Sequence, residues 1–144
     1  MRISTKGRYA LRMLIDLAEH QNDGYISLKD IASRQDVSKK YLEQIVPILN
    51  KENILKTNRG FQGGYMLAQT PDKYTVGDIL RLTEGSLSPV DCSDIDVSKS
   101  GSGEYAMLPV WQRLDSLINT YLDSVTLQDI LDDQRERYAN DYVI

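Results

Sequence analysis

Apolar residues in the first twenty positions recur three and four residues apart, which is the spacing of one buried face of an α-helix. This pattern predicts a helix that begins at Ser4 or Thr5 and ends before the turn signal at residues 22–24. We expect the opposite face of this helix to meet solvent, because polar residues occupy it: Arg8, Arg12, Asp16 and Glu19.

Two shorter apolar stripes follow, and a serine precedes each of them. Ser27 and Ser38 are suited to cap helices over residues 28–35 and 38–51, because a serine hydroxyl can accept a hydrogen bond from the first turn. Asn53 tolerates the left-handed conformation that ends many helices, so it suits the end of the second one. The short break between the two helices is typical of a helix-turn-helix.

A hairpin is predicted next, from apolar-rich segments at residues 54–58 and 64–68. Arg59 opens the loop between them, and three glycines lie between residues 60 and 64. Three helices followed by a hairpin are the element order of a winged helix-turn-helix. We therefore expect such a domain at residues 1–70.

The remaining residues, 71–144, predict a connecting helix capped by Thr75, a loop and a long helix. Near residues 105–125 the apolar residues are alternately four and three apart, which is the seam of a coiled coil. A short helix is expected after Thr126. The seam predicts a dimer interface formed by Met107, Trp111, Leu114, Ile118, Tyr121 and Val125. The predicted fold class is mostly α with a small β-hairpin: a winged helix-turn-helix plus a long dimerisation helix.

Charge is divided unevenly along the 144 residues, whose formal net charge is −4. Residues 1–70 carry eleven Lys and Arg against seven Asp and Glu, whereas residues 71–144 carry six against fourteen. The first half is therefore basic on an acidic chain. This division favours a first half that contacts a polyanion.

The exposed side of the second helix of the helix-turn-helix carries residues that can recognise base edges. Gln44 can pair with adenine, Glu43 can accept from cytosine, and Lys40 can reach guanine. The glycine-rich loop can approach a surface closely, and Arg59 is a residue type that a narrow minor groove attracts. Together these features predict a DNA-binding surface, with four candidate phosphate contacts at Lys6, Arg8, Lys39 and Lys56.

Four ordered segments resemble signatures of the bacterial Rrf-two (Rrf2) family: RISTKGRYA at residues 2–10, YLEQ at 41–44, RGFQGGY at 59–65 and TVGDIL at 75–80. The resemblance covers most of the chain. It implies a dimeric winged-helix transcription factor whose recognition helix enters the major groove while its wing lies near the minor groove. The implied base readers are Ser38, Lys40, Glu43, Gln44 and Arg59, and the predicted DNA-binding set also includes Arg2, Ser27, Tyr41, Gly60 and Gly63.

Cluster-binding members of this family carry three cysteines in the loop before the long helix. In this chain Cys92 matches the first, while Ser98 and Glu104 stand where the resemblance places the others. A cluster held by thiolates needs several of them, so we expect no iron–sulfur cofactor and no metal site. The chain is more similar to the cysteine-metabolism repressor branch, which implies a sulfur-metabolism enzyme or metabolite as the signal. Cys92 is then a vestige of the cluster site, a packed small side chain or a redox-reactive thiol.

Other function classes find little support. A single cysteine excludes an internal disulfide and favours the cytoplasm, and no apolar run is long enough to span a membrane. The glycine-rich loop lacks the Lys-Ser/Thr of a P-loop, so we expect no enzyme. We predict a homodimeric, sequence-specific repressor of sulfur or cysteine genes that binds a pseudo-palindromic operator. Two alternatives remain: an iron–sulfur or redox-sensing regulator of the same fold, and a protein-interaction module without DNA binding.

Overall fold

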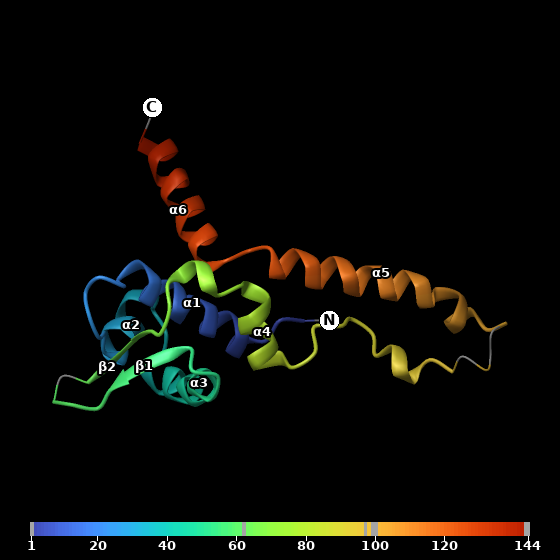
Figure 1. Ribbon diagram of the computed structural model, residues 1–144, viewed down its shortest axis with the longest axis horizontal. Helices are drawn as coiled ribbons and strands as arrows, with labels where there is room; N and C mark the ends of the chain where they lie inside the picture. Colours follow the sequence, from blue (N-terminus) through green and yellow to red (C-terminus); the bar gives the residue numbers. More distant parts are fainter. Residues whose placement is uncertain (1, 62, 97, 99–100, 143–144) are drawn as a thin grey trace.

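The computed structural model of the protein describes residues 2–61, 63–96, 98 and 101–142. Helices α1 to α4 and a two-stranded antiparallel sheet form the body, while α5 and α6 extend from it in different directions (Figure 1). The architecture confirms the predicted fold class, mostly α with one small β-hairpin. The elements are α1 (Thr5–Glu19), α2 (Leu28–Gln35), α3 (Lys39–Lys51), β1 (Leu55–Asn58), β2 (Gly64–Leu67), α4 (Val76–Glu84), α5 (Gly103–Asp123) and α6 (Leu127–Tyr142), with short 3-10 turns at Pro71–Lys73 and Cys92–Asp94.

Hydroxyl side chains begin the helices of the body. Ser4, Ser27, Ser38 and Thr75 each accept a hydrogen bond from a backbone N–H in the first turn, at 3.0–3.3 Å. Thr75 also donates its own N–H to the carboxylate of Asp78, which completes a capping box. Such a cap stabilises a helix by about 1 kcal/mol, and these four confirm the predicted starts of α1 to α4.

A single hydrophobic core lies between α1, α2, α3, α4 and the base of α6. The apolar stripe of α1 is buried as predicted, and each large side chain buried in this way contributes roughly 1.5–3 kcal/mol. The deepest members of the core come from five helices: Met13, Leu14, Leu17, Ile31, Leu42, Ile45, Leu49, Ile79, Leu127 and Leu131.

The prediction that Asp16 meets solvent is wrong. Its carboxylate is fully buried and receives two hydrogen bonds from the guanidinium of Arg34, at 2.9 and 2.7 Å, and a third from Gln35 at 3.2 Å. These partners lie on α2, so a charge on the polar side of α1 is neutralised where the two helices pack together. The hydrogen bond to Asp16 raises the pKa of Arg34. The ion pair therefore fixes α2, the first helix of the helix-turn-helix, to α1.

The hairpin is attached to the body by one residue that precedes α2. Ile26 exchanges two backbone hydrogen bonds with Tyr65 of β2, at 2.9 and 2.8 Å. A Cβ on Gly64 would lie 2.7 Å from the Ile26 carbonyl, so only glycine allows the two backbones to approach this closely. At the base of the hairpin, the buried Tyr74 hydroxyl donates to the Ile54 carbonyl at 3.1 Å. The hairpin formed by β1, its loop and β2, which we call the wing, is thus held at its base by backbone and side-chain hydrogen bonds.

The second half differs from its prediction in two respects. The long helix α5 ends at Asp123, so Val125 lies beyond it, in the connection to α6, where its carbonyl accepts from the Val76 N–H at 2.8 Å. The helix α6 has 16 residues rather than being short. Polar pairs one turn apart add to its stability, among them the Asp133–Arg137 ion pair at 2.9 Å. Among the described residues, the longest and most apolar helix still falls short of crossing a membrane.

Candidate nucleic-acid interface

The turn between α2 and α3 sets the direction of α3. Asp36 ends α2 in the left-handed conformation, with φ of 53°, and Val37 donates its N–H to the Ala32 carbonyl at 3.1 Å. Asn53, predicted to be left-handed, has φ of 55° and follows the end of α3. On its inner face α3 buries Leu42, Ile45, Val46 and Leu49.

The outer face of the first turns of α3 presents Lys39, Lys40, Glu43 and Gln44, all of them exposed. Among the described residues, no hydrogen bond or ion pair occupies these four side chains. Two cations, one carboxylate and one amide therefore remain available to an external partner along one face of a helix. Lysine cations can pair with phosphates, and carboxylate and amide groups can form hydrogen bonds with base edges.

Two predicted contact residues of this region have structural duties as well. The Ser38 hydroxyl caps α3, although it remains exposed. Tyr41 is half-buried and packs edge-on against Tyr9, with ring centroids 5.2 Å apart, which joins α1 to α3. Arg12 covers the other ring at 5.2 Å from its centroid and donates to the Gln35 carbonyl. The aromatic pair therefore fixes the start of α3 against α1.

The start of α1 contributes exposed basic side chains. Lys6 and Arg8 are exposed, and Arg8 donates to Thr5 at 3.1 Å. Arg2 is exposed too, in the segment that runs beside α4 (Figure 1), where Ser4 donates two hydrogen bonds to a Glu84 oxygen, at 2.7 and 2.6 Å. Ser27 is half-buried, and its hydroxyl caps α2 by accepting a hydrogen bond from the Asp30 N–H. This hydroxyl is therefore less available to an external partner than the exposed basic side chains.

The wing forms a second exposed basic element. Lys56 on β1 and Arg59 and Gly60 in the loop are exposed. A Cβ on Gly63 would lie 2.8 Å from the Asn58 carbonyl, which requires glycine at that position. Phe61, for which the sequence pattern predicts no role, lies at the tip of the loop and is fully exposed. An aromatic residue between glycines in a hairpin loop is the sequence signal that could have singled it out.

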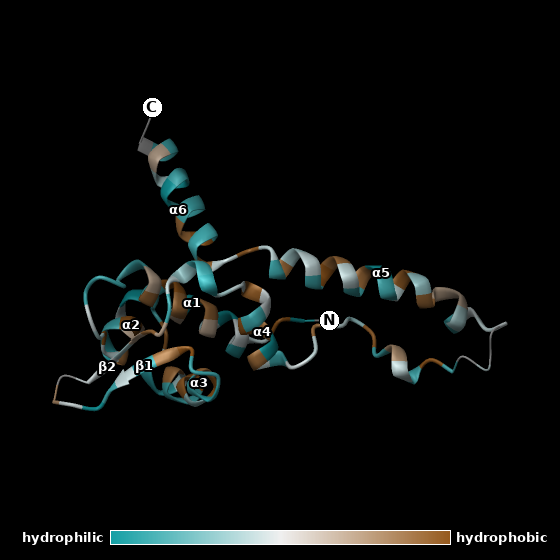
Figure 2. Ribbon diagram, viewed as in Figure 1, coloured by the Kyte–Doolittle hydropathy of each residue, from teal (hydrophilic) through white to brown (hydrophobic). Residues whose placement is uncertain are grey.

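Apolar residues alternate with polar ones along α5 (Figure 2). All of α5 is described, and none of its residues is buried. The predicted seam residues Trp111 and Ile118 are half-buried, and five other large apolar side chains of α5 are between 37% and 66% exposed: Met107, Val110, Leu114, Leu117 and Tyr121. Large apolar side chains therefore remain exposed along α5 in the single chain.

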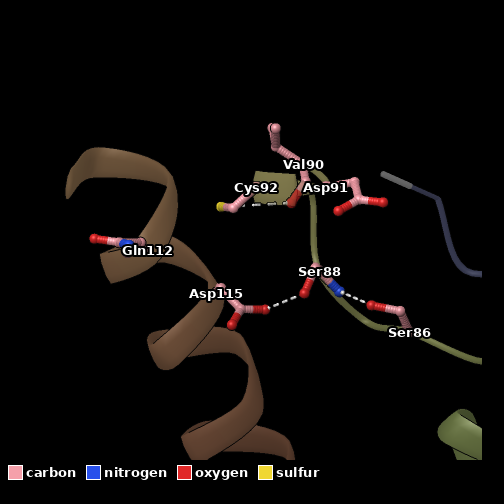
Figure 3. A pocket seen from close by; sticks show the side chains of 7 residues that line it. All are labelled: Ser86, Ser88, Val90, Asp91, Cys92, Gln112 and Asp115. Atoms are coloured by element: carbon pink, nitrogen blue, oxygen red, sulfur yellow. Dashed lines mark hydrogen bonds between the residues drawn. The ribbon is translucent and has the colours of Figure 1, made fainter. Parts of the chain in front are cut away.

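A hollow of about 440 Å³ lies between α5 and the segment that precedes it (Figure 3). Its lining residues are Ser86, Ser88, Val90, Asp91, Cys92, Gln112 and Asp115. The Cys92 sulfur is half-buried and turned toward α5, 3.9 Å from the Val90 carbonyl. Ser88 donates to Asp115 across the hollow at 2.6 Å.

The donor set does not fit an iron–sulfur cluster. Cys92 is the only thiol in the chain, and the other polar groups of the hollow are hydroxyls, carboxylates and an amide. The residues at the other expected ligand positions point elsewhere: Ser98 donates to Asp96 at 2.6 Å, and Glu104 lies exposed in the first turn of α5. Among the described residues, no group of three or more His, Cys, Asp or Glu is arranged to hold a metal ion.

Comparison with known proteins agrees with this architecture. Residues 3–133 match the family model Rrf2, described as "Iron-dependent Transcriptional regulator". The HTH-type transcriptional regulator CymR of Bacillus subtilis (strain 168) is 40% identical over 141 residues, which are 96% of this chain and 97% of CymR. The solved structure of CymR, the global cysteine regulator of B. subtilis, covers 90% of this chain and 95% of its own, with a TM-score of 0.75.

A second solved structure, T. potens IscR, is 43% identical, covers 95% of this chain and 90% of its own, and has a TM-score of 0.74. These relatives are transcriptional regulators, which places the chain among regulators rather than enzymes. The fold resembles theirs over 90% and 95% of this chain, respectively. The chain therefore belongs to the Rrf2 family of transcriptional regulators.

Proposed function

We propose that the chain is a sequence-specific DNA-binding repressor that acts in the cytoplasm as a homodimer on a pseudo-palindromic operator. One observation carries this proposal: the first turns of α3 present two cations, a carboxylate and an amide on an exposed face, with a rigid core behind them. A helix with this face fits the major groove, where the N-terminal residues of a recognition helix contact base edges.

Each exposed residue of α3 has a role in this proposal. The Gln44 amide pairs with adenine, and the Glu43 carboxylate accepts from the amino group of cytosine. Lys40 reaches guanine, and Lys39 contacts a phosphate, together with Lys6 and Arg8 from α1. Base contacts then supply sequence choice, and the lysine and arginine contacts supply affinity that depends on salt.

The wing extends the contact to the neighbouring minor groove. Arg59 is exposed at the start of the loop, and a narrow minor groove concentrates negative potential that attracts arginine. Lys56 on β1 contacts the phosphates beside it. The glycines at positions 60 and 63 let the loop backbone approach the DNA, because no Cβ stands in the way.

Dimerisation follows from the apolar seam of α5. One protomer leaves this seam exposed, and packing against the same seam of a second copy would bury it and fix the distance between two recognition helices. A two-fold protein on a two-fold operator then places its half-sites a whole number of helical turns apart.

Similarity to B. subtilis CymR supports cysteine or sulfur genes as the target, because its structure is described as that of the global cysteine regulator. The signal in this proposal is a sulfur-metabolism enzyme or metabolite. The hollow beside Cys92 is a candidate place for its action, because it lies between α5 and the segment that connects α5 to α4. A ligand there regulates DNA binding only if it favours one arrangement of the two DNA-binding heads.

Substitutions on α3 test the proposal. Glu43→Ala and Gln44→Ala should each relax sequence choice at one base pair by about 1–3 kcal/mol, whereas Lys39→Ala should weaken binding to all sequences alike. Affinities for a set of operator variants, measured at several salt concentrations, provide the readout. Glu19→Ala, an exposed change at the far end of α1, is the matched control. Unchanged discrimination in both Glu43→Ala and Gln44→Ala would remove α3 as the reading element.

A further inference from the structure

The tip of the wing carries the most exposed large apolar side chain of the described residues. Phe61 is as accessible as the residue in an extended peptide, and it is the only phenylalanine of a chain that has nine tyrosines. An exposed tyrosine would cost less free energy than an exposed phenylalanine, because its hydroxyl forms hydrogen bonds with water. A bare phenyl ring gains only when a partner removes it from water.

The loop and its base hold this ring away from the body. Gly60 donates its N–H to the side chain of Asn58 at 3.0 Å, which shapes the start of the loop. Below the loop, the hairpin is braced by the backbone bonds of Ile26 and by the buried hydroxyl of Tyr74. Figure 1 shows the loop projecting beyond the helices. The ring is therefore presented at the end of a supported arm.

The positive charge of the residues near Phe61 indicates a negatively charged partner. Between Glu52 and Asp72 the chain contains two basic residues, Lys56 and Arg59, and no acidic one. Both basic side chains are exposed on the same hairpin as the ring. A surface that combines phosphates with flat apolar faces matches this combination, and stacked base pairs beneath a sugar–phosphate backbone provide both.

We propose that Phe61 is an apolar wedge that enters the minor groove from the wing and partly unstacks one base step on each side of the operator. This inference rests on the proposed DNA-binding function. Arg59 and Lys56 bring the tip to the groove, and the phenyl ring opens the step and bends the duplex toward the major groove. Because pyrimidine–purine steps unstack most easily, the wedge also selects sequence at positions that α3 does not reach.

The test uses the duplex that the wild-type protein selects from a random library, with the fluorescent base 2-aminopurine placed at successive steps outside the α3 contacts. Wild-type protein should raise the fluorescence at one step on each side, and energy transfer between dyes at the duplex ends should report a bend. Phe61→Ala should abolish both signals. Phe61→Leu, which keeps an apolar wedge, should retain most of each.

A mismatch at that step makes the measurement quantitative, because it removes most of the unstacking cost in advance. Wild-type protein should bind the mismatched duplex about tenfold more tightly than the matched one, whereas Phe61→Ala should bind both equally. The wedge is refuted if the wild-type protein binds the selected duplex without a fluorescence rise at any step, or if Phe61→Ala keeps the fluorescence rise, the bend or the tenfold preference. Failure of the wild-type protein to select any sequence would instead refute the proposed function itself.

Discussion

Removing Arg34 should destabilise the protein strongly, because it leaves a charge buried. Arg34→Met keeps the length of the side chain but removes two of the three hydrogen bonds to the buried carboxylate of Asp16, leaving only the one from Gln35. Removing one partner of a buried ion pair costs about 3–5 kcal/mol. The Arg34 side chain is 37% exposed, and solvent weakens the pair, so we expect about 3 kcal/mol.

Thermal and urea unfolding measure this loss. For a chain of this length the entropy of unfolding is about 0.3 kcal/mol per kelvin, so a loss of 3 kcal/mol lowers the melting temperature by about 10 °C. Arg137→Met is the matched control, because its ion pair with Asp133 is equally short, at 2.9 Å, but lies on the surface. That change should cost less than about 1 kcal/mol.

The double variant Asp16→Leu/Arg34→Met distinguishes two causes of the lost stability: the unpaired buried charge of Asp16 and the lost packing of the Arg34 side chain. If the charge is the cause, removing it as well should recover most of the stability, because an apolar pair of similar volume often replaces a buried ion pair without loss. Equal melting temperatures for Arg34→Met and Arg137→Met would refute the reasoning. So would a double variant no more stable than Arg34→Met.

Three further changes test separate parts of the structure. Gly64→Ala should destabilise by roughly 1–3 kcal/mol in thermal unfolding, since its Cβ meets backbone at 2.7 Å, whereas Gly103→Ala, with nothing within 4 Å, should not. Burial raises the pKa of Tyr74, so its contribution is present below the unfolded tyrosine pKa of about 10 and is lost as pH rises. Tyr74→Phe should therefore cost about 1–2 kcal/mol at pH 7, and urea unfolding should show this deficit shrinking above pH 10. Leu114→Glu should give monomers or unfolded protein in sedimentation, whereas the exposed control Ser116→Glu should leave the oligomeric state unchanged.

Helix starts could be predicted because their signals are local. Ser4, Ser27, Ser38 and Thr75 precede apolar stripes, and each cap bond spans only three residues. Asn53 could be placed in the left-handed region for the same reason. By contrast, α6 was expected to be short, because its apolar stripe ends at Leu131 and the later residues are polar.

One error within the body, and one contact that the sequence pattern does not reveal, both come from contacts between residues distant in sequence. Asp16 was assigned to solvent because it lies on the polar side of α1, but its partner Arg34 stands eighteen residues away on another helix. Ile26 pairs with a residue of the hairpin across an even longer separation, which a single residue outside a strand pattern does not reveal. Periodicity along one helix reports which residues share a face and not what covers that face.

The candidate interface was predictable to the extent that helical periodicity separates the two faces of α3. Lys39, Lys40, Glu43 and Gln44 are exposed as that periodicity requires. Tyr41 was included in the contact set, but packing against α1 half-buries its ring, a detail set by tertiary structure. How these side chains meet DNA depends on a duplex and a second protomer, so the contacts stay predictions.

Selection of bound duplexes from a random library by the purified full chain tests the central claim most directly. We expect enrichment of an inverted repeat whose two half-sites lie one or two helical turns apart, about 10 or 20 base pairs from centre to centre. Binding to the recovered site should also weaken steeply as salt is raised. A library that emerges without an enriched sequence, or with a single half-site and no repeat, would contradict a dimeric repressor that reads DNA through α3.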